Sequence, residues 1–344
     1  MDGARVLLLL ALAGVAAHAS IVTVPLSNFH DVVYRGDKIS AVFHTGCTLT
    51  RFPKKGCVAE GRFPEACKTN TYDPKASRTA REQMWRTFEV TEVEYTHFGS
   101  RGEQFYDTLS FYDPKRQSTL SLRNADVGAS TKVWAFDHAV VCLAHRARGM
   151  TNGTFTDLVN SRQLNHQWMT VALKKANGIS ADGGAITFGG PDNERCESVV
   201  WWTPVVTGSF MWRFRVNTFG INAMTFRNIF VMANVDTGNS YMHIPGSYWS
   251  VVKRELKITK RGSYHTVPCD SKFKLTFSMG GHTFPVTEEH LVLNQQIDGQ
   301  CVVALKENEY KDDMFILGSA FFRAVCVIHD LQNEKLGFAH HRKL

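Results

Sequence analysis

Apolar and polar residues alternate along much of this chain in short runs, and Gly, Asn, Asp and Pro separate the runs. Alternation with a period of two is typical of β-strands that bury one face. The segment KFKLTFSMGGHTFPV, residues 272–286, has two such runs on either side of Gly280-Gly281. A short glycine turn between two strand-like runs predicts a β-hairpin. The pattern as a whole predicts an all-β fold.

Helical periodicity is scarce. Residues 154–164 place Phe155 and Leu158 on one face of a helix. Residues 246–256 show a similar apolar stripe, and Ser247 is the expected N-cap of that helix. We therefore expect a β-dominated chain with a few short helices.

The two halves of the chain contain a repeated arrangement. In each half an apolar run leads into a Thr-Gly turn, at residues 43–46 (FHTG) and 235–238 (VDTG). In each half a later apolar stretch ends in a small residue, at residues 139–142 (AVVC) and 315–318 (FILG). A single x-Thr-Gly tripeptide is a weak indication, but two copies in matching contexts indicate a duplicated structural unit.

The duplicated turns predict a composite site. If they face each other across a two-fold axis, His44 and Asp236 lie side by side and form the reactive pair. Glycine lets one turn approach the other closely, and a threonine hydroxyl can form a hydrogen bond across the interface. The supporting residues of the two turns are Thr45, Thr237, Gly46 and Gly238.

The N-terminal segment predicts export. MDGARVLLLLALAGVAAHAS has one Arg before an apolar stretch and ends in the small-x-small pattern Ala17-His18-Ala19. This pattern predicts a signal peptide over residues 1–19, whereas the alternative, a membrane anchor, requires a longer apolar stretch. We expect a protein of the secretory pathway without a membrane span, either extracellular or in a lysosome- or vacuole-like compartment.

Cysteine content and charge bear on whether the chain binds a metal or a nucleic acid. The chain has 8 Cys, and disulfides are available to an exported protein. No C-x-x-C pair is present, so the cysteine spacing fits no zinc motif. We expect no metal and no cofactor. The formal charge is +7, and its densest basic segment, KRELKITKRG at residues 253–262, is interpreted as a solvated face. No nucleic-acid-binding motif accompanies it, so we expect no nucleic-acid partner.

In the two Thr-Gly turns and in further segments, the chain resembles the pepsin-like aspartic proteases. These are two-lobed all-β enzymes with one Asp-Thr-Gly turn from each lobe. EVEYTHFGSRGEQFYDTLSF, residues 92–111, resembles the flap hairpin, with Tyr95 at the position of the flap tyrosine. AITFGGPD and the later WWTPV resemble the passage between the lobes. The resemblance implies a bilobal fold with an N-terminal lobe over residues 20–195 and a C-terminal lobe over residues 196–344. It also implies a monomer with a peptide or protein ligand in the interlobe cleft, where Tyr95, Gly46 and Gly238 contact the ligand.

Several positions depart from the family pattern. His44 stands where the family has its first catalytic Asp, as in the histo-aspartic proteases. Arg51 stands where a Trp usually supports the flap tyrosine, and Ser319 stands where an Asp is customary. These departures bear directly on whether the chain hydrolyses peptides.

The resemblance also implies disulfides. Two of them, Cys57–Cys67 and Cys269–Cys301, occupy positions where the family has disulfide loops. In family members the position of Cys47 packs near the apolar-apolar-Gly element, where this chain has Cys142. We therefore hypothesise a Cys47–Cys142 disulfide, which requires Cα atoms about 4.4–6.8 Å apart.

Two points about the cysteines stay open. The alternative for Cys47 is a nucleophile with His44 as its base, but no oxyanion-hole motif is visible. Cys196 and Cys326 are left over, and only counting supports a bond between them.

The chemistry of a His–Asp pair differs from that of two carboxylates. Two carboxylates about 3 Å apart share a proton, whereas a histidine beside an aspartate favours imidazolium with carboxylate near neutral pH. The first hypothesis is a peptide-binding homologue with weakened or absent hydrolysis. The second is an endopeptidase with Asp236 as base and His44 as acid. A metal site at this pair is a third alternative.

One modification motif is present. Asn152-Gly153-Thr154 is a glycosylation sequon, and it precedes a predicted helix. We expect Asn152 to lie on a surface loop and to carry a glycan.

Overall fold

The computed structural model describes residues 20–26, 31–33, 38–60, 67–68, 70–92, 98–134, 139–145, 152–174, 183–206, 208–309 and 313–342. The predicted signal peptide, residues 1–19, and Tyr95 lie outside this range. Strands dominate the described residues, which confirms the all-β prediction. No helix among them is long and apolar enough to cross a membrane. The helices found there are α1 (Thr154–Asn160), α2 (Gly246–Glu255), α3 (Glu288–Leu291) and α4 (Ser319–Ala324).

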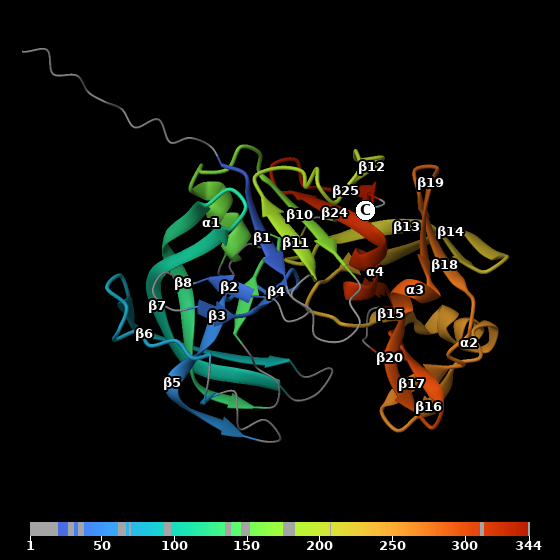
Figure 1. Ribbon diagram of the computed structural model, residues 1–344, viewed down its shortest axis with the longest axis horizontal. Helices are drawn as coiled ribbons and strands as arrows, with labels where there is room; N and C mark the ends of the chain where they lie inside the picture. Colours follow the sequence, from blue (N-terminus) through green and yellow to red (C-terminus); the bar gives the residue numbers. More distant parts are fainter. Residues whose placement is uncertain are drawn as a thin grey trace, which may run out of the picture.

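The first half of the chain forms a six-stranded sheet with the order β4-β9-β5-β8-β7-β6. Figure 1 shows this sheet on the left, with β6 at the outer edge of the molecule. A short hairpin of β2 (Asp31–Val33) and β3 (Lys38–Ser40) lies beside it. The strands of the six-stranded sheet are β4 (Val42–His44), β5 (Arg51–Glu60), β6 (Arg81–Glu92), β7 (Phe98–Asp113), β8 (Ser118–Trp134) and β9 (Val140–Cys142).

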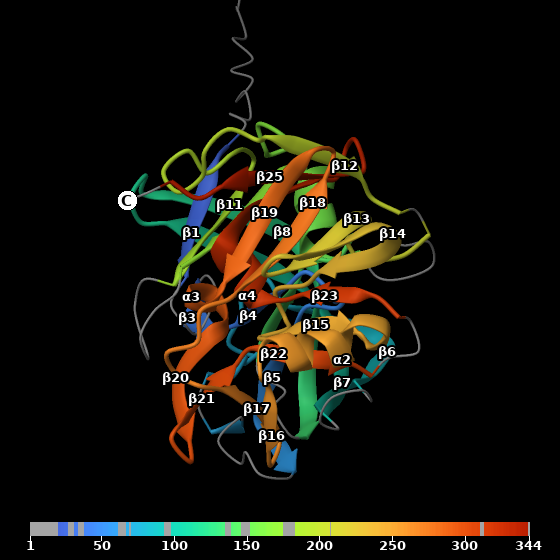
Figure 2. The ribbon, with the colours of Figure 1, turned by 90° about the vertical axis from the view of Figure 1, so that its right-hand side faces the viewer.

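The second half forms a seven-stranded sheet with the order β19-β18-β13-β14-β23-β15-β22. Figure 2 shows β18 and β19 as a long hairpin on one face, with α2 and a separate four-stranded sheet below them. That smaller sheet has the order β16-β17-β21-β20. The strands are β13 (Arg213–Ile221), β14 (Met224–Val235), β15 (Met242–Pro245), β16 (Thr259–Arg261), β17 (Tyr264–Val267), β18 (Lys274–Met279), β19 (His282–Thr287), β20 (Val292–Ile297), β21 (Gln300–Val303), β22 (Leu305–Asn308) and β23 (Phe315–Leu317).

A third sheet joins the two halves, with the order β1-β11-β10-β24-β25-β12. It lies between the two other large sheets in Figure 1. Within it, β10 from the first half pairs antiparallel with β24 from the second half. The boundary between the two lobes at residues 195 and 196 remains a prediction. The strands are β1 (Val22–Leu26), β10 (Trp168–Leu173), β11 (Gly184–Phe188), β12 (Trp201–Pro204), β24 (Val325–Asp330) and β25 (Lys335–His340).

One continuous apolar core extends through both halves. Trp212 is fully buried in it, and its indole donates a hydrogen bond to the backbone of Leu143 at 3.0 Å. The rings of His145 and His329 pack edge-on against Trp212, each with a centroid distance of 4.8 Å. This aromatic contact links segments that are far apart in the sequence.

The local predictions have mixed outcomes. The hairpin forms as expected, and Gly280 and Gly281 have φ angles of 54° and 82°, which suit a two-residue turn between strands. The first predicted helix ends at Asn160, because Arg162 takes a φ angle of 57°. The prediction that Ser247 caps α2 is wrong. The chain enters the helix directly from β15, so Pro245 is the N-cap and Ser247 lies inside the first turn.

Candidate active site

Strand pairing fixes the position of His44. It is the last residue of β4, which runs parallel to β9, so that His44 lies opposite Cys142. The backbone N–H of Leu143 donates a hydrogen bond to the carbonyl of His44 at 2.8 Å. The apolar run of β4 thus delivers the imidazole at the point where the Thr-Gly turn begins.

The second turn is built in the same way. β14 ends at Val235 and runs parallel to β23, so that Val235 lies opposite Leu317. The N–H of Asp236 donates to the carbonyl of Leu317 at 3.1 Å. Each turn therefore leaves a strand that is paired with its later apolar partner, as the sequence repeat predicts.

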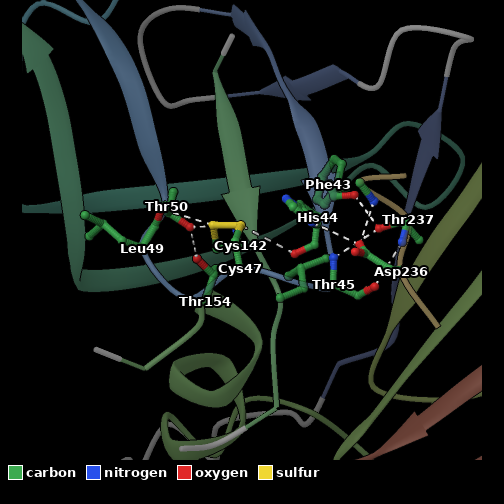
Figure 3. Close-up of a disulfide and its surroundings, with 12 residues drawn as sticks. Phe43, His44, Thr45, Cys47, Leu49, Thr50, Cys142, Thr154, Asp236 and Thr237 are labelled. Carbon is green, nitrogen blue, oxygen red and sulfur yellow. Dashed lines mark hydrogen bonds and ion pairs between the residues drawn. A yellow bond between two sulfur atoms is a disulfide. The ribbon is translucent and has the colours of Figure 1, made fainter. Parts of the chain in front are cut away.

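Thr45 and Thr237 join the two turns by reciprocal hydrogen bonds (Figure 3). The N–H of Thr45 donates to Oγ1 of Thr237, and the N–H of Thr237 donates to Oγ1 of Thr45, both at 3.1 Å. Each hydroxyl also donates to a backbone carbonyl of the opposite strand, Thr45 to Val235 at 3.1 Å and Thr237 to Phe43 at 2.5 Å. The two turns are held as one symmetric unit.

The structure brings His44 and Asp236 into direct contact. Nε2 of His44 lies 3.0 Å from Oδ1 of Asp236, and the side chains are 14% and 9% exposed. The carboxylate also accepts hydrogen bonds from the N–H of Gly238 at 2.9 Å and from Nδ2 of Asn239 at 2.7 Å. Burial alone would raise the pKa of Asp236, but the charge and hydrogen bond of His44, with these two donors, lower it. Asp236 is therefore held as a carboxylate.

Two glycines permit this contact. A Cβ atom on Gly46 would lie 2.6 Å from Oδ2 of Asp236. A Cβ atom on Gly238 would overlap the ring of His44. Each turn thus needs a glycine because the reactive side chain of the other turn packs directly against its backbone.

A disulfide ties the first turn to the sheet. Cys47 and Cys142 are bonded, with their Cα atoms 4.9 Å apart, so the hypothesised pairing is present (Figure 3). The N–H of Cys142 donates to Oγ1 of Thr50 at 2.9 Å, and Thr50 in turn contacts the hydroxyl of Thr154 at 2.6 Å. Because its sulfur is in a disulfide, Cys47 is no nucleophile, and that alternative is wrong.

The six remaining cysteines also form disulfides. The Cα–Cα distances are 5.4, 4.9 and 6.0 Å, all within the usual range. The bonds are Cys57–Cys67, Cys269–Cys301 and Cys196–Cys326, the last of which the sequence supported only by counting.

Asn239 is a site residue that the sequence reasoning missed. It occupies the same place after Asp236 as Cys47 does after His44, so the repeat itself could have indicated it. The two turns differ at this position, because Asn239 donates to a carboxylate whereas Cys47 is locked in a disulfide. The duplicated unit has therefore become chemically asymmetric.

A second pair of equivalent positions lies behind the turns. Arg51 in β5 pairs antiparallel with β9, and His243 in β15 pairs antiparallel with β23. Both side chains are almost fully buried. Burial and the charge of Lys306 lower the pKa of His243 to about 3, while the charge of Asp236 acts in the opposite direction. His243 is therefore a neutral imidazole close to the site.

Three further candidate residues are Tyr95, Asn152 and Ser319. Tyr95 lies outside the described residues. Asn152 is exposed just before α1, and its Nδ2 donates to Oδ1 of Asp157 at 3.1 Å. Ser319 is buried behind the second turn and donates to the carbonyl of Thr237 at 3.3 Å.

Comparisons with known proteins agree with this geometry. The family model described as eukaryotic aspartyl protease matches residues 35–341. Gastricsin of Oryctolagus cuniculus is 28% identical over 316 residues, which cover 87% of this chain and 76% of the relative. Pepsin A of Gallus gallus is 24% identical over 334 residues, which cover 92% of this chain and 86% of the relative. With its all-β architecture and two facing Thr-Gly turns, the chain belongs to the eukaryotic aspartyl protease family and is pepsin-like.

Proposed function

We propose that this pepsin-like protein binds peptides or proteins in a cleft between its lobes and hydrolyses them weakly or not at all. The observation that carries the proposal is the contact of 3.0 Å between Nε2 of His44 and Oδ1 of Asp236. In this proposal His44 takes the place of the first catalytic carboxylate. Tyr95, Gly46 and Gly238 contact the ligand.

The chemical argument rests on the state of Asp236. Peptide hydrolysis at such a site needs one group that accepts a proton from water and another that donates a proton to the peptide. A general base acts best when its pKa is close to the working pH, and the pKa of Asp236 is lowered. Oδ1 already accepts hydrogen bonds from Gly238 and His44, and Oδ2 accepts one from Asn239. The carboxylate is thus a buried charge that hydrogen bonds stabilise, and it is a weak base.

The second candidate function is an active endopeptidase of the histo-aspartic kind. Its support is that Oδ2 of Asp236 accepts a hydrogen bond from Asn239, and a carboxylate oxygen has a second lone pair that can take the proton of an attacking water. His44, as an imidazolium, would stabilise the developing oxyanion and then protonate the leaving amine. In this mechanism the two side chains exchange no proton with each other before the water attacks.

Catalysis by the chain can be tested with a diverse peptide library. The secreted protein, Asp236→Asn and His44→Asp are incubated with the library from pH 3 to pH 8, and cleavage is followed by mass spectrometry. We expect background cleavage from the first two. Turnover by the unmodified chain that disappears in Asp236→Asn would instead establish the endopeptidase.

The His44→Asp variant tests the scaffold. Restoring a pair of carboxylates should restore general acid–base catalysis, which contributes about 10²–10⁴-fold to the rate. If the folded variant stays inactive, the residues around the pair are responsible for the loss of hydrolysis. The double variant His44→Asp with Arg51→Trp is then compared with His44→Asp alone. Ligand binding is measured separately, by retention of library peptides on the immobilised unmodified chain.

The proposed location is the secretory pathway. Four disulfides fit an oxidising compartment. The proposal includes cleavage of residues 1–19, a glycan on Asn152 and a monomeric state. Intact mass of the secreted protein before and after deglycosylation tests the first two points, and sedimentation equilibrium tests the third.

A further inference from the structure

Strand β6 presents two large apolar side chains to solvent. Trp85 is 93% exposed and Met84 is 75% exposed. Single exposed apolar residues are common on protein surfaces, but a tryptophan and a methionine side by side at this exposure indicate a contact surface. Neither belongs to the composite site at the Thr-Gly turns.

The backbone conformation of β6 holds these two side chains away from the sheet. Pairing between β6 and β7 is interrupted between Glu82 and Thr87, so the residues between them bulge out of the sheet. Trp85 has a φ angle of 66°, which is uncommon for a bulky residue. Gln83 is buried and donates to Oδ1 of Asp126 at 2.9 Å, which anchors the base of the bulge. Met84 and Trp85 form the tip.

Arg81 and Arg86 flank this tip along β6. Nη2 of Arg81 donates to Oδ1 of Asn124 at 2.6 Å, and its guanidinium lies 5.9 Å from the ring centre of Tyr106. Asn124 and Tyr106 line a hollow of about 600 Å³ together with Arg86 and Arg123. Positive groups beside an exposed aromatic side chain suit the interface of a phospholipid bilayer, where tryptophan is enriched and headgroup phosphates pair with arginine.

Nearby carboxylates limit the electrostatic contribution. Arg86 lies 4.0 Å from Asp126, and Glu82 is exposed beside Arg81. Asp126 and Asp157 line the same hollow as Arg86 and Arg123. The local net charge is therefore small. Insertion of the two apolar side chains supplies most of the affinity, and contact with phosphates adds a smaller part. Weak and reversible binding follows, because stable anchoring of a peripheral protein takes more than one strong attachment.

We propose that the Met84–Trp85 tip inserts into a phospholipid bilayer surface and docks the protein on it. A bilayer fits better than a protein partner, because a stable protein interface buries about 800 Å² on each side and a tryptophan supplies only about 150–250 Å². β6 is also the edge strand of its sheet and lies at the outer edge of the molecule in Figure 1. From there the tip can reach a flat surface.

Vesicle co-sedimentation tests the proposal. The unmodified chain and the double variant Met84→Ser/Trp85→Asn are mixed with vesicles of phosphatidylcholine alone or with phosphatidylserine. Asn tolerates a positive φ angle, so the bulge is preserved. Phe230→Asn is the matched control, because Phe230 is also an exposed aromatic residue in a strand, at 61% exposure and with a φ angle of 49°.

The expected results are specific. The unmodified chain and the Phe230 control bind mixed vesicles equally, and the double variant loses roughly tenfold or more of this binding. Arg123→Gln loses about fivefold, which corresponds to one basic residue at an anionic surface. Tryptophan fluorescence shifts to the blue on binding in the unmodified chain, and most of this shift is absent in the double variant.

Three outcomes would overturn the proposal. One is that the unmodified chain fails to sediment with either kind of vesicle. Another is that the double variant binds as well as the Phe230 control while its thermal unfolding is unchanged. The third is self-association of the unmodified chain that the double variant abolishes, which would assign the tip to a second copy of the chain.

Discussion

Replacing either of two buried histidines should make the protein less sensitive to acid. His329 is fully buried, and its Nδ1 lies 3.2 Å from the carbonyl of Met169. Burial lowers the pKa of His329 to about 3, and the pKa of His243 is also about 3 for the same main reason. The fold accepts both rings as neutral groups and excludes their charged forms.

The sign of the effect follows from proton binding. In the unfolded chain a histidine binds its proton near pH 6.5, about 3.5 pH units above the value in the fold. Between these values the unfolded state holds more protons, so the stability of the fold falls as the pH falls. At pH 4.5 each histidine costs about 3 kcal/mol relative to neutral pH, and both together cost about 5–6 kcal/mol. That is a large part of the usual 5–15 kcal/mol of a folded protein.

The assay is urea unfolding at pH 7.5 and at pH 4.5. The measured quantity is the difference between the two unfolding free energies, for the unmodified chain, His329→Asn, His243→Asn and the exposed control His340→Asn. The cavity that each substitution leaves affects both pH values and cancels. Each buried variant should reduce the difference by about 3 kcal/mol, and the control should not change it.

Other titrating groups do not disturb this comparison. The lowered pKa of Asp236 means that its contribution is lost only as the pH falls below the ordinary value of 3.8 and through the folded pKa, outside the chosen range. Burial raises the pKa of Asp126 and of Asp157, which opposes the histidines, but both carboxyls are present in every variant. If the pH difference is the same in all four proteins, the reasoning from burial is refuted. The same acid sensitivity requires a check of folding in every activity assay at low pH.

Three further changes test how the site is built. Replacing Cys47 by Ser together with Cys142 by Ala should lower the free energy of unfolding by about 3–5 kcal/mol, because the bond spans 95 residues, and a urea titration measures this. An effect below about 1 kcal/mol would show that the bond does not constrain the unfolded chain. Thr237→Val removes a hydroxyl that donates and accepts across the turns, and it should cost about 1–3 kcal/mol by the same titration, whereas Thr237→Ser should keep most of the stability. Gly238→Ala places a methyl group in the ring of His44 and should lower the stability by about 1–3 kcal/mol. An unchanged melting temperature would contradict the close packing of the two turns.

Much of the fold could be predicted from local pattern. The alternation of residues 272–286 gave the hairpin of β18 and β19, because strand pairing across a two-residue turn depends only on neighbouring residues. The two Thr-Gly turns and their apolar partners were found by comparing the halves with each other. The Cys47–Cys142 bond followed from placing those two elements side by side, as the resemblance implied.

Other features depend on contacts that no local pattern contains. Thr45 and Thr237 are 192 residues apart, and only the packing of one half against the other makes their hydrogen bonds. The donor role of Asn239, the burial that keeps His243 and His329 neutral, and the exposure of Trp85 all depend on which surfaces are covered in the folded chain. The sequence by itself determined the strands, the turns and the residue types at the site. Tertiary structure decided their distances and their access to water, because both arise from the packing of segments far apart in the chain.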